Sequence, residues 1–338
     1  MVELGFERLA CEWCVYHRGT TSSVTIFAVH VNDIICTSSL LAENEHFKAQ
    51  LWQHWDISDL AAAKFTLGIS ISHNRPSHSI HLAQMALINC IVDQYSQHDT
   101  HPLSMPMVAG LQIERLDKSQ PVVAHILSWI EQTPYHSLIG CLNYLAMATR
   151  PDISFAISRL SMVLDCYHLE HWSTTIRVVR YLKGSCLLSL QLGGTNPIHA
   201  LRFLDSDYNN CPTTSHSISG YCFSLGSGMI SWSSHKHNHA ADSSCYAEYI
   251  SLHDASHEVL FLCQLLDGIN MPDLAPTSLY CDNDTACQLT EDQHWHTKVR
   301  HFHVKYYSTR DLVCLGELKV VCINSLENTA DILTKPLS

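Results

Sequence analysis

Leu201-Arg202-Phe203-Leu204-Asp205 is a short apolar run that ends in an acidic residue. Successive side chains of a strand point to opposite faces, so Leu201, Phe203 and Asp205 share one face if the run is extended. Asp205 then lies at the end of a strand, on the side that packs, where an acidic side chain is unusual. The run therefore predicts a strand with a carboxylate at its tip.

The sequence on either side of this run predicts a mixed layer of strands and helices. The expected elements, in chain order, are strands at 200–204, 220–225 and 229–232, a long helix at about 245–267, a strand at 278–281, a short helix after 283, a helix near 299–312, a strand at 317–323 and a helical segment from 328. This order is typical of an α/β domain with a mixed sheet.

Three further acidic residues interrupt apolar patterns in the same part of the chain. Glu248 lies one turn before the apolar stripe of the long helix, and Asp282 directly follows an apolar strand. Asp331 lies in the last helical segment. Each of them, taken singly, is more often a helix cap or a turn residue than a ligand.

The four acidic residues together indicate a different chemistry. Like charges at one sheet edge repel one another unless a cation binds or one group is protonated. Oxygen ligands suit Mg²⁺ or Mn²⁺ rather than Zn²⁺. If the four converge, they form a site for two such ions, which activate water and stabilise the leaving oxygen of a phosphodiester.

The first half of the chain is expected to begin with a β-hairpin. Apolar, β-rich runs at 24–30 and 34–37 flank the polar pair Asn32-Asp33. A helix at 43–55, two short strands at 64–72 and 79–82, and a mainly helical stretch at 135–190 follow. A turn-rich seam, Gly193-Gly194-Thr195-Asn196-Pro197, separates these elements from the second half.

Composition limits the class of protein. The chain has 338 residues, of which 46% are hydrophobic and 15% charged, so it is expected to fold into two or three domains. Its net charge of −12, from 20 basic and 32 acidic side chains, argues against a broad basic surface for nucleic acid. A local nucleic-acid groove with acidic catalytic residues is compatible with this charge.

The cysteines and the N-terminus bear on the compartment. The 15 cysteines lack paired CxxC spacings and are expected to be reduced thiols. Met1 is not followed by the basic and apolar regions of a secretory signal, and no apolar run approaches the roughly 20 residues of a membrane span. We therefore expect a soluble protein of the cytoplasm, the nucleus or both, neither secreted nor bound to a membrane.

Short motifs occur in a fixed order along nearly the whole chain. They are Leu67-Gly68, Gly140-Cys141-Leu142-Asn143-Tyr144, Thr149-Arg150-Pro151-Asp152, His171-Trp172, Arg180-Tyr181-Leu182-Lys183-Gly184, Asp205-Ser206-Asp207, Ser217-Ile218-Ser219-Gly220-Tyr221, Ser231-Trp232-Ser233, Ala247-Glu248-Tyr249, Cys281-Asp282-Asn283, Arg300-His301 and Ala330-Asp331-Ile332-Leu333-Thr334-Lys335-Pro336-Leu337. In these motifs the chain resembles the C-terminal end of copia-type LTR-retrotransposon polyproteins.

The resemblance implies a fold and a domain order. The expected fold class is α/β (α+β): a ribonuclease H-like mixed sheet with flanking helices, preceded by a partial reverse-transcriptase palm, thumb and connection. The expected parts are a residual polymerase palm hairpin at 1–37, a thumb-like region at 38–130, a helical connection at 131–192, a linker at 193–197 and a ribonuclease H-like domain at 198–338.

The resemblance also implies an activity and its residues. Asp205, Glu248, Asp282 and Asp331 match the family's metal-binding carboxylates. Such a site hydrolyses the RNA strand of an RNA–DNA hybrid with two Mg²⁺ (or Mn²⁺) ions. His301 matches a histidine of the family's late helix, either near the scissile phosphate or in packing. The implied partners are the hybrid and, as a second possibility, the missing N-terminal part of the polyprotein.

One departure from the family concerns the hairpin tip. His30-Val31-Asn32-Asp33 stands where the family's polymerase has Tyr-Val-Asp-Asp. Asn32 cannot replace a carboxylate as a ligand for two divalent ions without a loss of charge compensation. We therefore expect no RNA-directed DNA synthesis by this chain alone. The alternative to a nuclease is a catalytically silent transposon relic, or a module retained by the host to bind nucleic acid or protein.

Overall fold

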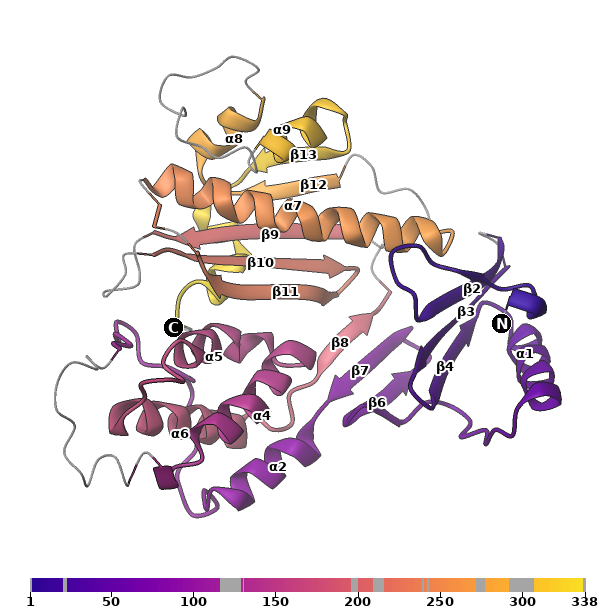
Figure 1. The fold of residues 1–338 in the computed structure, drawn as a ribbon, viewed down its shortest axis with the longest axis horizontal. Coiled ribbons are helices and arrows are strands. Elements are labelled where there is room, and N and C mark those ends of the chain that lie inside the picture. Colours follow the sequence, from indigo (N-terminus) through magenta and orange to yellow (C-terminus); the bar gives the residue numbers. More distant parts are fainter. Residues whose placement is uncertain are drawn as a thin grey trace. The chain divides into compact units, whose positions relative to one another are not determined.

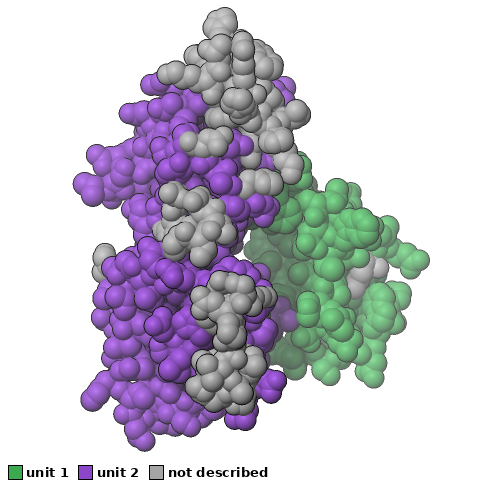
Figure 2. Space-filling view, turned by 60° about the vertical axis from the view of Figure 1, so that its left-hand side comes forward, with its two compact units in different colours: residues 1–64, 256–277 green, residues 65–255, 278–338 purple. Residues whose placement is uncertain are grey.

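The structure of the chain is a computed structural model. It divides into two compact units, coloured green and purple in Figure 2. Unit 1 comprises residues 1–64 and 256–277, and unit 2 comprises residues 65–255 and 278–338. The residues that the structure describes are 2–20, 23–115, 129, 131–195, 200–208, 216–238, 240–241, 243–271, 277–291 and 307–336.

Unit 1 is built on one antiparallel sheet whose strands lie in chain order. Its elements are β1 (Glu7–Arg8), β2 (Val15–Thr20), β3 (Ser23–His30), β4 (Asp33–Ser38) and α1 (Leu41–His54). The pairing of β3 with β4 confirms the expected hairpin. Phe27 of β3 and Phe47 of α1 stack with their ring centroids 4.9 Å apart, so the helix covers one face of the sheet.

The first part of unit 2 combines a small antiparallel sheet with a helical layer. Four residues of one helix, Tyr135, Leu138, Leu142 and Leu145, recur at steps of three and four and are completely buried, so one stripe of that helix faces the core. The elements are β5 (Phe65–Thr66), β6 (Ile69–Asn74), β7 (Ser79–Ala83), β8 (Leu190–Gly193), α2 (Met85–Gln94), α4 (Tyr135–Ala148), α5 (Ser154–Ser161) and α6 (Leu169–Gly184).

The second part of unit 2 is a five-stranded mixed sheet in the order β11-β10-β9-β12-β13, visible in Figure 1. Its strands are β9 (Ala200–Asp207), β10 (Ile218–Leu225), β11 (Gly228–Lys236), β12 (Thr277–Cys281) and β13 (Leu318–Cys322). β9 pairs antiparallel with β10 and parallel with β12. Parallel neighbours need a long crossover, and α7 (Ser244–Gly268) supplies it. The expected α/β class, a mixed sheet with flanking helices, is confirmed.

Both faces of β9 are covered, which places its acidic residue inside the fold. Phe203 packs in a small apolar cluster with the C-terminal segment η6 (Thr329–Leu333). Asp205 lies on the same face as Phe203, as the alternation predicts, but Leu201 is 38% exposed because the strand leaves the core at that end. Leu204, on the opposite face, is completely buried.

We expect a substitution at Gly220 to separate η6 from the sheet. Gly220 of β10 lies opposite Asp205, and a Cβ atom built on it would be 2.8 Å from Leu333 Cβ and 2.9 Å from Thr334 Cγ2. Gly220→Val should therefore lower the free energy of unfolding by about 1–3 kcal/mol. Urea denaturation followed by circular dichroism measures the change.

Gly140→Ala is the matched control for Gly220→Val. Gly140 lies inside α4, and a Cβ atom there meets nothing within 4 Å. Alanine should raise the free energy of unfolding by roughly 0.5–1 kcal/mol, because it reduces the freedom of the unfolded chain. An unfolding midpoint of Gly220→Val equal to that of the wild type would contradict the close packing of η6 on β10.

Candidate metal centre

Asp205 lies near the C-terminal end of β9 and is 3% exposed. The Thr334 hydroxyl donates a hydrogen bond to Asp205 Oδ2, and the Ser251 hydroxyl donates to the Asp205 carbonyl oxygen at 3.0 Å. Burial raises the pKa of the Asp205 carboxyl to about 6, against the lowering effects of Thr334 and Lys335. The fold therefore holds a carboxylate where it is costly to keep one ionised.

Glu248 lies in the second turn of α7 and is 6% exposed. Its Oε1 atom accepts a hydrogen bond of 3.3 Å from the backbone N–H of Ser206. Its Oε2 atom is buried and has no hydrogen-bond partner among the residues that the structure describes. Burial raises the pKa of the Glu248 carboxyl to about 9, and the charges of Asp205 and Asp282 add to the shift.

Asp282 and Asp331 come from two further elements and lie close to Asp205. Asp282 is the residue after β12, and Asp331 belongs to η6. The Asn328 amide caps η6 and donates a hydrogen bond of 2.8 Å to the Leu204 carbonyl oxygen, which ties η6 to β9. One carboxylate oxygen each from Asp205, Asp282 and Asp331 lie within 4.8 Å of one another.

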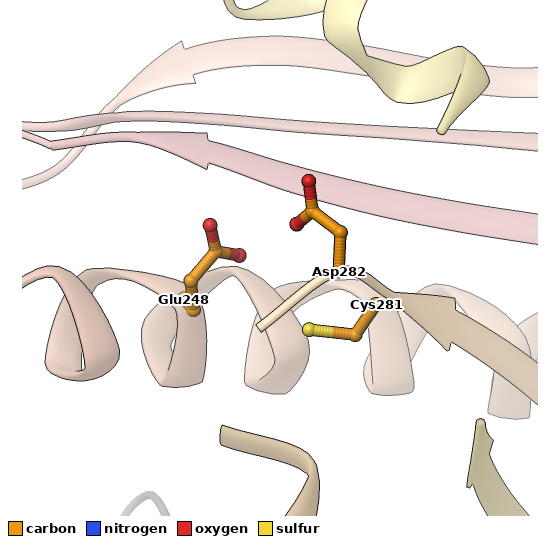
Figure 3. A group of neighbouring side chains, drawn as sticks. All are labelled: Glu248, Cys281 and Asp282. Carbon is orange, nitrogen blue, oxygen red and sulfur yellow. The ribbon is translucent and has the colours of Figure 1, made fainter. Parts of the chain in front are cut away.

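A second group of possible ligands shares Asp282 with the first. Atoms of Glu248, Cys281 and Asp282 lie within 4.8 Å of one another. Figure 3 shows these three side chains. Through Asp282 the structure links all four acidic residues that the sequence analysis selects. Cys281 is a member that the sequence analysis did not select, although it directly precedes Asp282 in the quoted motif.

Lys335 is the basic residue of this cluster, and the sequence analysis did not select it either. Its Nζ atom lies 2.9 Å from Asp331 Oδ1 and 3.7 Å from Asp205 Oδ2. The sequence feature that could have pointed to Lys335 is its place in the motif at 330–337, four residues after Asp331. Lys335 therefore compensates part of the negative charge that the acidic residues bring together.

The residues present fit hard divalent cations. Three carboxylates within 4.8 Å of one another supply the oxygen ligands that Mg²⁺ and Mn²⁺ prefer. The Glu248 Oε2 atom is buried and has no hydrogen bond among the described residues. A bound cation would supply the interaction that this buried atom lacks. The protein thus has an acidic group of the kind that holds metal ions.

Comparisons with known proteins place the chain in a family. The family model described as reverse transcriptase (RNA-dependent DNA polymerase) matches residues 1–109. The chain is 29% identical, over 95% of its length, to the Retrovirus-related Pol polyprotein from transposon TNT 1-94 of Nicotiana tabacum. It is also 29% identical, over 100% of its length, to the corresponding polyprotein from transposon RE1 of Arabidopsis thaliana. The chain belongs to the copia-type retrotransposon Pol polyproteins.

The copia-type chain spans about a quarter of the length of these relatives, 24% of the first and 22% of the second. Residues 1–109 of the chain match the reverse-transcriptase region of such a polyprotein. Among solved structures, the N-terminal RNase H domain of Rv2228c from Mycobacterium tuberculosis, solved as a fusion with maltose binding protein, has a TM-score of 0.31 and 14% identity. That likeness covers 40% of this chain and 91% of the solved chain.

The polymerase-like tip of the copia-type chain lies in unit 1. Asn32 and Asp33 are exposed in the turn between β3 and β4. Val31, which precedes them, has φ of +54° and is 83% exposed. A β-branched residue rarely adopts this backbone conformation, so the tip is strained. His301 lies outside the described residues. Its place near the four acidic residues Asp205, Glu248, Asp282 and Asp331, which we call the acidic cluster, stays a prediction.

Two further expectations concern the oxidation state of the cysteines and the presence of a membrane span. The cysteines that the structure describes are free. Over the same part of the chain, no helix has both the length and the apolar character that a bilayer crossing requires.

Without metal, the copia-type chain is expected to lose stability as pH rises. Glu248 has a pKa near its ordinary value of 4.5 when unfolded but about 9 when folded. Between these values the folded state holds a proton that the unfolded state has released, so the free energy of unfolding falls with pH. For this group the fall approaches about 1.4 kcal/mol for each pH unit. Urea denaturation with a chelator, between about pH 5 and pH 8, measures it.

Two variants separate this effect from general pH sensitivity. Glu248→Gln removes the titrating group and should flatten the decline. Glu327→Gln removes an exposed acidic residue outside the cluster and should leave the decline as in the wild type. Equal slopes for wild type and Glu248→Gln would show that Glu248 is not protonated at neutral pH.

Proposed function

We propose that the copia-type chain hydrolyses the RNA strand of RNA–DNA hybrids with two Mg²⁺ or Mn²⁺ ions held at the end of β9. The observation that supports this proposal is the convergence of carboxylates from four separate elements. Asp282 belongs to two ligand groups, one with Asp205 and Asp331 and one with Glu248 and Cys281. A carboxylate shared by two adjacent groups is what a pair of neighbouring cations requires.

The chain's own residues would divide the work as follows. Asp205, Glu248, Asp282 and Asp331 would hold the ions, which when bound supply an activated water and stabilise the departing oxygen. The Thr334 hydroxyl fixes the orientation of the Asp205 carboxylate. The backbone N–H of Ser206 does the same for Glu248 at 3.3 Å. These bonds hold the ligands in place before any ion arrives.

The hybrid is the partner that this proposal requires. Hybrids are recognised largely through the shallow minor groove and the 2′-hydroxyls, which needs few basic side chains and is compatible with a net charge of −12. His301 would act near the scissile phosphate. The N-terminal part of such a polyprotein is a second partner that we propose on the basis of the family.

DNA synthesis is not part of the proposed function. The hairpin tip carries Asn32 before Asp33, and both are exposed at a turn of unit 1. Synthesis of DNA requires carboxylates that hold two Mg²⁺ ions at the primer terminus, and an amide supplies no negative charge. We therefore assign the activity to the acidic cluster of unit 2.

One observation favours a second function without cleavage. Lys335 Nζ lies 2.9 Å from Asp331 Oδ1 and 3.7 Å from Asp205 Oδ2, so the cluster already has a counter-charge of its own. If Lys335 keeps that place, the chain would bind hybrids, or another partner, as a catalytically silent module. The cleavage assay below separates the two functions.

The first test is cleavage of the RNA strand of a labelled hybrid with Mg²⁺ or Mn²⁺. The wild type should cleave, and Asp205→Asn should lower the rate by at least about a hundredfold, because a metal ligand is lost. Asp254→Asn, on the same helix as Glu248 but paired with His235 at 3.0 Å, is the control and should retain the rate. Binding of the hybrid by the wild type without cleavage in either metal would contradict the nuclease proposal.

The second test is primer extension on an RNA template. The chain should not extend the primer, and Asn32→Asp should not restore extension beyond the background of the uncatalysed mixture. Extension by the wild type would contradict the assignment of activity to the acidic cluster alone. A duplicate reaction with Asp205→Asn shows whether the two activities, if both occur, are separate.

A further inference from the structure

Cys281 brings a thiol into the acidic cluster. Its Sγ atom and one carboxylate oxygen each from Glu248 and Asp282 lie within 4.8 Å of one another. In Figure 3 the Cys281 sulfur lies on the side of its residue that faces Glu248. Cys281 is completely buried at the end of β12, so this thiol is part of the interior of the site.

A second observation points to a ligand at this place. Glu248 is more than nine-tenths buried, and its Oε2 atom has no hydrogen-bond partner within the described part of the chain. The Cys281 sulfur accepts a hydrogen bond from the backbone N–H of Asn283 at 3.5 Å, and its thiol has weak contacts with the Asn283 carbonyl oxygen at 4.0 Å and with the Cys287 side chain. None of these contacts involves Glu248, so the Cys281 sulfur and the Glu248 Oε2 atom both keep lone pairs that can bind an ion.

The dimensions of the group suit one small cation. Three atoms that lie within 4.8 Å of one another fit around a point no more than about 2.8 Å from each, since 4.8 Å divided by √3 is about 2.8 Å. Zinc bonds to sulfur at about 2.3 Å and to carboxylate oxygen at about 2.0–2.2 Å. Shifts of about half an ångström would close the group around the ion.

We propose that Glu248, Cys281 and Asp282 form a site for a thiophilic divalent cation such as Zn²⁺. One sulfur and two carboxylates give three protein ligands, with water as a fourth. Thiolate ligands select soft or borderline ions, whereas Mg²⁺ takes oxygen ligands only. On binding, the Cys281 thiol and the Glu248 carboxyl, which carries a proton in the metal-free protein, each release that proton to solvent, and sulfur–metal and carboxylate–metal bonds form.

The site has a consequence for the proposed nuclease, and this part rests on the proposed function. Asp282 belongs both to this group and to the group with Asp205 and Asp331. An ion bound to Cys281 would also be coordinated by the carboxylates of Asp282 and Glu248. It would therefore compete with the ions that cleavage needs for these two ligands. Zn²⁺ is then an inhibitor of the Mg²⁺-dependent reaction rather than a substitute for Mg²⁺.

The test uses the full chain, freed of metal, and Cd²⁺ as a spectroscopic probe for the site. The wild type should show a thiolate-to-cadmium charge-transfer band in the ultraviolet. Cys281→Ser should lose that band and bind Zn²⁺ at least about a hundredfold more weakly in competition with a chromophoric chelator. Glu248→Gln, which keeps the shape of the side chain, should weaken Zn²⁺ binding by at least about tenfold.

Cys222→Ser is the matched control for Cys281→Ser. Cys222 of β10 is also buried, and its sulfur lies 3.4 Å from the Thr329 hydroxyl, but it is not in the ligand group. This variant should keep the cadmium band and the wild-type affinity for Zn²⁺. Circular dichroism on each variant establishes that the fold is retained.

Several outcomes overturn the site. They are the absence of a band in the wild type, a band that survives in Cys281→Ser, and a band lost in Cys222→Ser. The failure of the nuclease proposal is a separate result, since a chain that cleaves no hybrid can still show the band. If it does cleave, inhibition by Zn²⁺ should be relieved in Cys281→Ser, and equal inhibition of the two proteins would overturn the competition for Asp282.

Discussion

The burial of two neighbouring carboxyl groups, those of Asp205 and Glu248, is the constraint on which the acidic cluster of unit 2 depends. Each carboxyl is almost fully removed from water, and each pKa is raised. Removing carboxylates from water is expensive unless protons, cations or hydrogen bonds compensate. The surroundings supply a hydrogen bond from the Thr334 hydroxyl and the positive charge of the Lys335 ammonium, and the raised pKa of Glu248 means that this carboxyl holds a proton at neutral pH when no metal is bound. The same crowding that weakens the metal-free fold prepares it for divalent ions.

The sequence was sufficient to find the acidic residues but not their neighbours. Strand alternation selects Asp205, and helix periodicity selects Glu248, because each acidic side chain continues an apolar pattern. Their convergence depends on β9 lying between β10 and β12, a non-local pairing that no local pattern contains. Lys335 and Cys281 were missed for the same reason. A lysine near a chain end and a cysteine in a strand look ordinary until the sheet brings acidic residues beside them.

The same limit applies to the fold. The hairpin of β3 and β4 and the long helix α7 were predicted from alternation and periodicity within a few residues. The strand at Leu190–Gly193 was absorbed into a helical stretch, because its partner, β7, lies more than 100 residues earlier. The helix Met85–Gln94 was not predicted either, although its buried residues recur with helical spacing. Short elements whose stability comes from distant partners carry little local signal.

The attachment of η6 to β9 has a consequence for the order of folding. Asp331 lies 126 positions after Asp205, so the acidic cluster closes a long loop of the chain. Contacts of such sequence separation form late, after most of the sheet has condensed. An ion bound by both Asp205 and Asp331 would therefore stabilise the native state but not the transition state of folding. Magnesium would then lengthen the lifetime of the folded chain while leaving its rate of formation almost unchanged.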